Sequence, residues 1–129
     1  VYGPDNNKSK RKIDTYGKVE LYSGDRMLVP TGLVFDLAES QSLRIHPRSG
    51  LSLKNGIVVA NCEGIVDADY VNQTYVMLQN ISRQIFHIND GDRIAQGEVV
   101  HSTQVRFVEC DEEPKEKTSR AGGFGSTGV

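Results

Sequence analysis

Hydrophobic and polar residues alternate in short runs through the middle of the chain, and this spacing predicts β-strands. Val19 and Leu21 alternate with polar neighbours, and Leu43 and Ile45 repeat the pattern. Further short runs, rich in β-branched or aromatic residues, follow at 57–60, 74–78, 84–88, 99–100 and 105–108. No stretch carries a sustained apolar stripe at the helical period, so we expect β structure throughout residues 18–108.

The predicted strands are separated by residues that favour turns. These segments read Ser-Gly-Asp at 23–25, Lys-Asn-Gly at 54–56 and Asn-Asp-Gly-Asp at 89–92. We expect residues 35–38 to form one further strand and turn. Many short strands with regularly spaced turns are typical of a sandwich, jelly roll or barrel. The predicted fold class is therefore all-β.

The composition changes near both ends of the chain. Residues 1–18 are polar and contain a basic run at 8–12, so we expect a solvated loop there. Residues 111–117 are charged, contain a proline and lack an apolar anchor, which is typical of a mobile linker. We therefore divide the chain into a polar basic loop (1–18), a β domain (19–110) and a flexible linker with a Gly-rich flap (111–129).

Charge and composition argue against several classes of function. The formal net charge is -2, so no global basic field recruits nucleic acid. Cys62 and Cys110 fit no disulfide or metal framework, and His46, His87 and His101 share no metal-ligand spacing. No signal peptide or membrane-spanning apolar run is visible. We expect a cytoplasmic location, with the nucleus as the alternative for a eukaryotic or viral protein.

Residues 122–129 read Gly-Gly-Phe-Gly-Ser-Thr-Gly-Val. Glycines allow backbone N–H groups to form an anion-binding nest, and hydroxyls add donors for phosphate oxygens. This composition indicates a flap that closes over a phosphorylated ligand with a flat ring. The alternative from composition alone is a disordered terminus.

Three interior segments and this tail together resemble a known family. The segments are PRSGL at 47–51, NCEGIVDADY at 61–70 and GDRIAQ at 91–96, followed by the tail at 122–129. In order and spacing they resemble the second to fifth motifs of the trimeric dUTPases. The first family motif, Ala-Gly-Tyr-Asp-Leu, is not visible, and we expect it to precede Val1. The resemblance implies a jelly-roll-like fold, a homotrimer with shared active sites and a flexible C-terminal arm.

The resemblance implies that the protein hydrolyses dUTP to dUMP and pyrophosphate. Such activity limits uracil incorporation in DNA and supplies dUMP for dTMP synthesis. Asp67 matches the family residue that activates the water attacking the α-phosphorus. Mg²⁺ is the implied cofactor, held mainly by the triphosphate and water, with no direct protein ligand visible. The implied partners are dUTP and further copies of the chain, without stable nucleic-acid or membrane binding.

Family resemblance also assigns the substrate contacts. Asn61 matches the pyrimidine-binding residue, and the Tyr70 ring would pack on deoxyribose and exclude a 2′-hydroxyl. Residues 57–60 and 74–78 would wall this pocket as a hairpin, and the pocket would exclude the thymine methyl. The further residues assigned to substrate are Arg48, Ser49, Gly50 and Gln96 on the phosphate side, Gly64 and Met77 at the pocket, and Arg120, Phe124, Gly125, Ser126 and Thr127 in the tail.

Two alternatives stay open at this point. One is a non-hydrolytic dUTPase-like regulator that binds nucleotide, since a fold does not dictate function. The other is a relative of the dCTP deaminases, which share the fold. The sequence around Asp67 and the Gly-Gly-Phe flap disfavour this second alternative.

Overall fold

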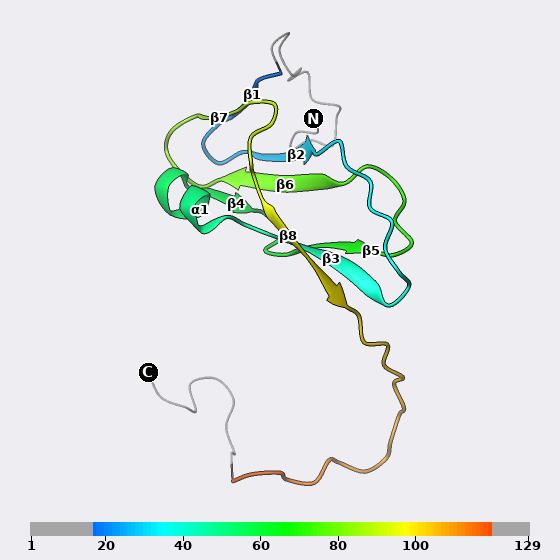
Figure 1. Ribbon diagram of the computed structural model, residues 1–129. Helices are drawn as coiled ribbons and strands as arrows, with labels where there is room; N and C mark the ends of the chain where they lie inside the picture. Colours follow the sequence, from blue (N-terminus) through cyan, green and yellow to red (C-terminus); the bar gives the residue numbers. More distant parts are fainter. Residues whose placement is uncertain (1–16, 120–129) are drawn as a thin grey trace.

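The computed structural model describes residues 17–119, in which it contains eight strands and one helix (Figure 1). The predicted N-terminal loop and Gly-rich flap lie largely outside these residues. The elements are β1 (Val19–Leu21), β2 (Arg26–Pro30), β3 (Gln41–His46), α1 (Ser49–Asn55), β4 (Ile57–Val59), β5 (Gly64–Asp67), β6 (Tyr75–Asn80), β7 (Phe86–Ile88) and β8 (Gln96–His101).

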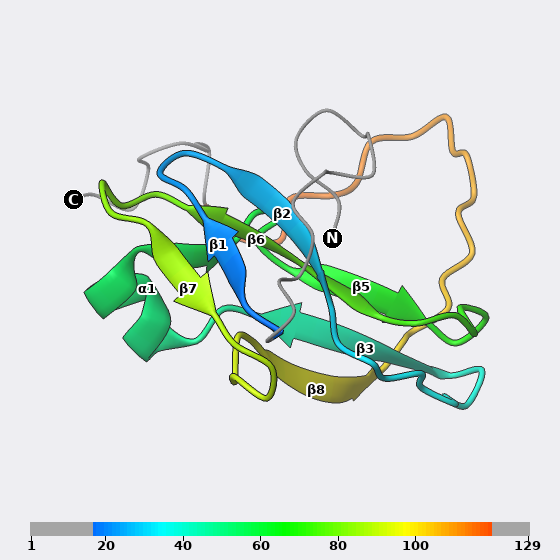
Figure 2. The same cartoon turned by 90° about the horizontal axis from the view of Figure 1, so that it is seen from above.

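The strands form three antiparallel sheets, with the strand orders β2-β6-β4, β5-β3-β8 and β1-β7. The first two sheets lie over one another, and the β1–β7 ribbon lies beside them (Figures 1 and 2). After β8 the chain leaves this body as an extended segment (Figure 1). The all-β prediction is therefore confirmed, apart from one short helix.

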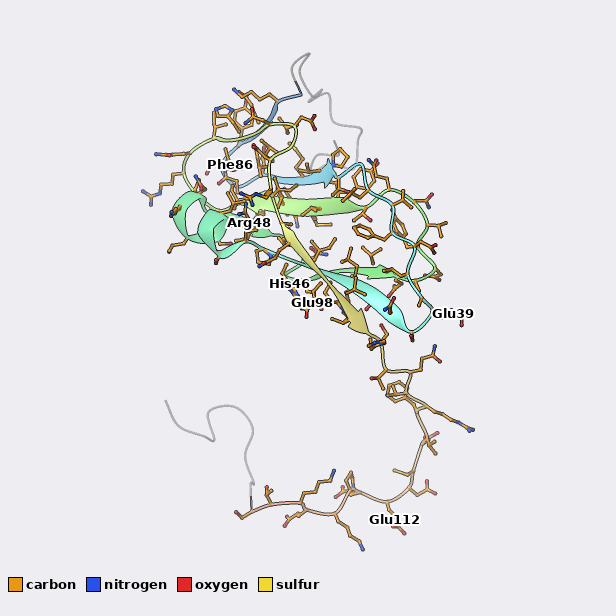
Figure 3. All side chains as sticks on the ribbon, viewed as in Figure 1. Glu39, His46, Arg48, Phe86, Glu98 and Glu112 are labelled. Atoms are coloured by element: carbon orange, nitrogen blue, oxygen red, sulfur yellow. The ribbon has the colours of Figure 1, made fainter. Side chains whose placement is uncertain are left out.

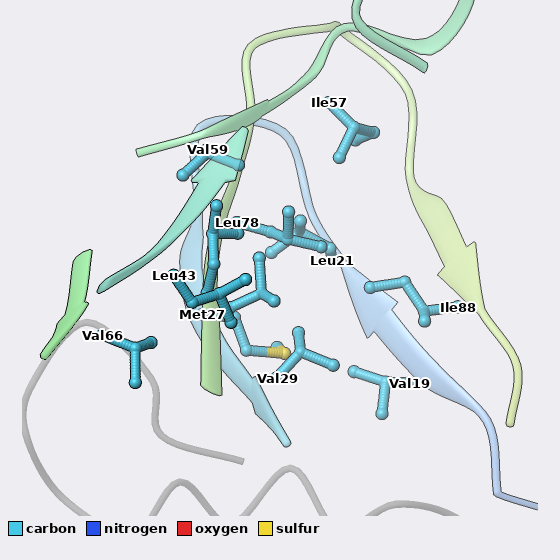
Figure 4. Packing of buried hydrophobic residues seen from close by; sticks show 12 residues of the cluster. Val19, Leu21, Met27, Val29, Leu43, Ile57, Val59, Val66, Leu78 and Ile88 are labelled. Atoms are coloured by element: carbon cyan, nitrogen blue, oxygen red, sulfur yellow. The ribbon is translucent and has the colours of Figure 1, made fainter. Parts of the chain in front are cut away.

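The core lies between the sheets and follows from the alternation of residues along each strand. In β6, Val76, Leu78 and Asn80 are buried while the residues between them are partly exposed. Period-two alternation places such residues on one face of a strand. Figure 4 shows the resulting cluster of aliphatic side chains and one methionine. Its members are Val19, Leu21, Met27, Val29, Leu43, Ile45, Ile57, Val59, Val66, Val76, Leu78 and Ile88.

Strand β3 is the central strand of its sheet and carries the register that positions the site. Leu43 pairs with Val66 on β5 and with Val99 on β8. Ile45 has a glycine on each side, Gly64 on β5 and Gly97 on β8. A Cβ on Gly64 would lie 3.1 Å from Ile45 Cβ, so a side chain there would press on the buried Ile45.

The expectation of β structure throughout residues 18–108 is wrong at three places. Residues 49–55 form α1, a seven-residue helix that ends at Gly56 in the left-handed conformation (φ 64°). Residues 35–38 and 105–108 are not strands. The exposed fraction of Phe107 is 92%. A strand needs the backbone of a neighbour, and no described strand pairs with either segment.

The expected hairpin of residues 57–60 and 74–78 is only half right. Strands β4 and β6 do pair, with Val59 opposite Leu78. However, the chain between them passes through β5, which pairs with β3 in the other sheet. The two strands are therefore neighbours in a sheet but not a hairpin, and their connection links the two layers.

Candidate functional site

The segment between β3 and α1 carries the predicted phosphate-side residues. Arg48 is the N-cap of α1 in an extended conformation, and Ser49 and Gly50 form the first turn of the helix. The guanidinium of Arg48 donates through Nη1 to the carbonyl oxygen of Arg93, at 2.6 Å. This bond uses one of the five guanidinium N–H donors. Figure 3 shows Arg48 beside α1.

Gln96 joins this segment from β8. Its Nε2 donates to the carbonyl oxygen of Pro47, at 2.9 Å, and Gln96 lies opposite His46 in the sheet. The structure thus brings together all four residues predicted for the phosphate side. Two hydrogen bonds, from Arg48 to the β7–β8 connection and from Gln96 to Pro47, hold the segment between β3 and α1 against β8 and the connection before it.

A second group of predicted residues lines a cavity of about 110 Å³, here called the candidate base pocket. Asn61 and Gly64 come from the turn between β4 and β5 and from the start of β5, and Met77 comes from β6. The backbone N–H of Ala60 donates to the Met77 carbonyl oxygen, at 2.8 Å, and so attaches the turn to β6. The other lining residues are Leu28, Ile45, Val59, Ile65, Val66, Tyr75 and Val76.

Asp67 and Tyr70 lie beside this pocket. Asp67 is the exposed last residue of β5 and directly follows Val66, which lines the pocket. The Tyr70 backbone N–H donates to the Asp67 carbonyl oxygen, at 3.1 Å, and the Tyr70 hydroxyl donates to the Gln73 carbonyl oxygen, at 2.8 Å. These bonds tie the Tyr70 ring to the turn after β5, with 39% of the residue exposed.

Asp67 and the phosphate-side segment lie at opposite ends of β3 in one chain. Asp67 pairs with Ser42 near the start of β3, whereas Arg48 follows two residues after its end at His46. Extended chain of this length spans roughly 20 Å. One chain therefore does not bring Asp67 into hydrogen-bond or one-water reach of Arg48.

The sequence interpretation missed an ionic cluster at the pocket turn. Glu63 accepts a hydrogen bond from Arg44 Nη1 at Oε1 (3.0 Å), and its Oε2 lies 2.7 Å from His46 Nε2. The His46 hydrogen bond, aided by the Arg44 charge, lowers the pKa of Glu63 while desolvation opposes the shift. Period-two alternation put Arg44 and His46 on one face, but nothing in the sequence placed Glu63 across from them.

The rest of the described chain adds little to the site. A larger, mainly apolar cavity of about 830 Å³ includes Gln96 alone among the predicted site residues. Residues 17–119 hold no group of three or more His, Cys, Asp or Glu side chains arranged for a metal ion. None of the helical structure described is long and apolar enough to cross a membrane. The predicted tail residues Arg120, Phe124, Gly125, Ser126 and Thr127 lie outside the described range.

Comparison with known proteins identifies the family. The dUTPase family model matches residues 13–128. The deoxyuridine 5′-triphosphate nucleotidohydrolase of Rhizobium johnstonii is 44% identical over 117 residues, which are 91% of this chain and 74% of that protein.

Solved structures agree with this assignment in fold. The dUTPase of Staphylococcus bacteriophage 80alpha, solved with dUPNHPP, has a TM-score of 0.76 at 21% identity, and the match covers 100% of this chain and 92% of that one. A mutant dUTPase of phage phi11 of S. aureus, whose structure shows the coordination of a structural Mg(II) ion, has a TM-score of 0.66 at 20% identity, with 74% and 78% covered. The chain belongs to the dUTPase family.

Proposed function

We propose that the protein hydrolyses dUTP to dUMP and pyrophosphate. The match to the family model and the nucleotidohydrolase relatives support this activity. The observation that carries the proposal is a small pocket with Asn61 in its wall and Asp67 one residue beyond its edge. These relatives favour neither a non-hydrolytic regulator nor a dCTP deaminase.

The candidate base pocket suits a pyrimidine. The Asn61 amide offers both a donor and an acceptor, as the edge of uracil requires. Met77 and the aliphatic side chains supply apolar walls around a small cavity, which we propose fits uracil closely. Thymine would therefore be excluded by steric overlap, and Tyr70 would pack on the deoxyribose.

Asp67 is proposed as the catalytic residue. Its exposed carboxylate accepts a hydrogen bond from a water molecule and directs the water oxygen at the α-phosphorus. As the new P–O bond forms, the bond from the α-phosphorus to the bridging oxygen breaks and pyrophosphate leaves. The water proton passes to Asp67 and then to solvent. Arg48, Ser49 and Gln96 would bind the phosphate oxygens, where negative charge gathers as the bond breaks.

Mg²⁺ is proposed as the cofactor. When bound, it neutralises charge on the triphosphate oxygens. Within residues 17–119 there is no carboxylate and histidine cluster that could cage an ion, so the donor set fits a Mg²⁺ that arrives on the nucleotide. The structural Mg(II) ion of the phage phi11 enzyme is a property of that protein.

We further propose a homotrimer with active sites shared between subunits. The separation of Asp67 from Arg48 along β3 supports it, because the two side chains of one chain start from opposite ends of that strand. Exposed Val105, Phe107 and Val108 on the segment that leaves the body are also typical of a contact with another chain. The tail residues from Arg120 to Thr127 would close over the nucleotide of such a shared site.

Pyrophosphate release from dUTP with Mg²⁺ tests the proposed activity, using the full-length protein, with dTTP, dCTP and UTP assayed in parallel. Asp67→Asn should reduce kcat by about a hundredfold or more, because the water loses its base. Asp69→Asn is the matched control, an exposed carboxylate two residues away, and should retain most of the activity. Nucleotide binding without turnover by the wild type would reject hydrolysis.

A further inference from the structure

The turn that carries Asn61 is anchored by a residue outside the predicted site. Glu63 follows Asn61 by two positions, and its carboxylate bridges Arg44 and His46 on the partly exposed face of β3. The two contacts measure 3.0 Å and 2.7 Å and use different carboxylate oxygens. A single side chain thus fixes the end of the turn to two positions on the central strand of the sheet.

The backbone of this turn is strained at one residue, and Glu63 adds a side-chain contact beside it to the backbone pairing of β5 with β3. Cys62, between Asn61 and Glu63, has φ 64°, and among the described residues it is the only non-glycine residue with positive φ. The left-handed region is unfavourable for an ordinary side chain and persists where the surroundings enforce it. Backbone bonds from Cys62 to Val59 (3.0 Å) and from Glu63 to Asn61 (2.7 Å) close the turn, but neither reaches β3.

We propose that Glu63 is a positioning residue for base recognition, which holds the Asn61 turn against β3 by bridging Arg44 and His46. This inference rests on the proposed function, because it assumes that Asn61 reads the base. Without the bridge, the Asn61 amide would sample more orientations and the pocket would widen. The energetic effect falls on binding of the base, since Asp67 lies at the far end of β5.

The electrostatic surroundings agree with this role. Arg44 lies between Ile65 on β5 and Glu98 on β8, so two carboxylates can face one guanidinium. Glu63 is the carboxylate with a hydrogen bond to Arg44, and its contacts with His46 and Arg44 lower the pKa of Glu63. His46 lies opposite Gln96 and adds positive charge beside Glu63 when protonated.

The same contact also reaches the phosphate side. His46 precedes Pro47, whose carbonyl oxygen accepts the Gln96 hydrogen bond, and Arg48 follows. Figure 3 shows His46 between Arg48 and Glu98. The Glu63–His46 contact therefore joins the base-pocket turn to the phosphate-side segment of the same chain.

Steady-state kinetics on dUTP with the full-length protein test the proposal. Glu63→Ala should raise KM roughly two- to fivefold with kcat nearly unchanged, the range expected for losing partly exposed ion pairs. Glu63→Gln keeps one acceptor oxygen and should fall between Glu63→Ala and the wild type. Glu98→Ala is the matched control on the same face and should leave KM unchanged. The preference for dUTP over dTTP should fall in Glu63→Ala, because a looser turn admits the thymine methyl.

A double-mutant comparison separates positioning from general destabilisation. His46→Gln alone should raise KM, and adding it to Glu63→Ala should raise KM little further, because the shared contact is already lost. Equal KM in Glu63→Ala and Glu98→Ala, or a fall in kcat with KM unchanged, would overturn the proposal. Absence of dUTP turnover in the wild type would instead refute the proposed function, so the two failures are distinguishable.

Discussion

Two neighbouring residues, Gly64 and Glu63, shape the candidate base pocket through their close contacts with β3. Gly64 allows β5 to approach β3 closely enough for Asn61, Met77 and Val66 to surround one small pocket. Glu63, its neighbour, is exposed yet contacts both the Arg44 guanidinium and the His46 imidazole. Exposed ion pairs usually contribute little stability, but this one holds a turn that contains a left-handed Cys62. Its local effect should therefore be visible both in the pKa of Glu63 and in base binding.

The lowered pKa of Glu63 predicts a pH-dependent contribution to stability. Its pKa in the folded protein lies below the ordinary value of 4.5, so the contribution is present above pH 4.5 and is lost as pH falls through the folded pKa. Thermal unfolding of the wild type and Glu63→Gln should therefore differ at pH 7 and converge in stronger acid. A difference that persists unchanged in acid would show that the carboxylate charge is not the cause.

Among the strands, β3 organises the site because β5 and β8 both pair with it. Ile45 is buried between Gly64 and Gly97 and lines both the candidate base pocket and the larger cavity. This branched side chain fills space that neither glycine can fill. The separation between Asp67 and Arg48 also follows from β3, since Asp67 pairs with Ser42 near its start and Arg48 follows its end at His46.

Shortening Ile45 should therefore destabilise the protein. Ile45→Ala should lower the free energy of unfolding by about 2–5 kcal/mol, and Ile45→Val by about 0.5–1.5 kcal/mol. Urea unfolding measures both. Ile81→Ala, with 63% of the residue exposed, is the control and should change stability by less than about 0.5 kcal/mol. Equal losses at the two positions would contradict the role of Ile45.

The same elements show what the sequence could and could not predict. Alternation at Val19 and Leu21 and at Leu43 and Ile45 predicted strands, because one buried face imposes period two. Helix α1 buries none of its residues, so it leaves no apolar stripe to detect. The pattern at 105–108 is that of a strand, but pairing depends on a distant backbone that local sequence does not encode.

The candidate site could also be predicted only in part from the sequence. The family motifs predicted that Gln96 lies near Arg48 and Met77 near Asn61, although both pairs are distant in sequence. The Glu63 bridge was missed because it joins a turn to a strand whose register only the fold reveals. The spacing of the histidines did not predict this bridge either, because His46 contacts the Glu63 carboxylate and is not part of a group of metal ligands.

In the whole molecule, each active site should require more than one chain. Asp67 and Arg48 lie at opposite ends of β3, and the segment after β8 runs away from the body with Phe107 exposed (Figure 1). A closed ring of three copies would bring Asp67 of one chain to the phosphate-side segment of the next. Such an arrangement makes activity depend on residues from two chains.

Subunit complementation tests whether each active site draws residues from two chains. Asp67→Asn and Arg48→Ala should each abolish most dUTP hydrolysis alone. Equal mixtures, coexpressed so that chains exchange, should regain about a quarter of wild-type sites, because some interfaces pair an intact Arg48 with an intact Asp67. Persistent inactivity in mixed oligomers of wild-type mass would contradict the shared site, since each chain would then need both residues itself.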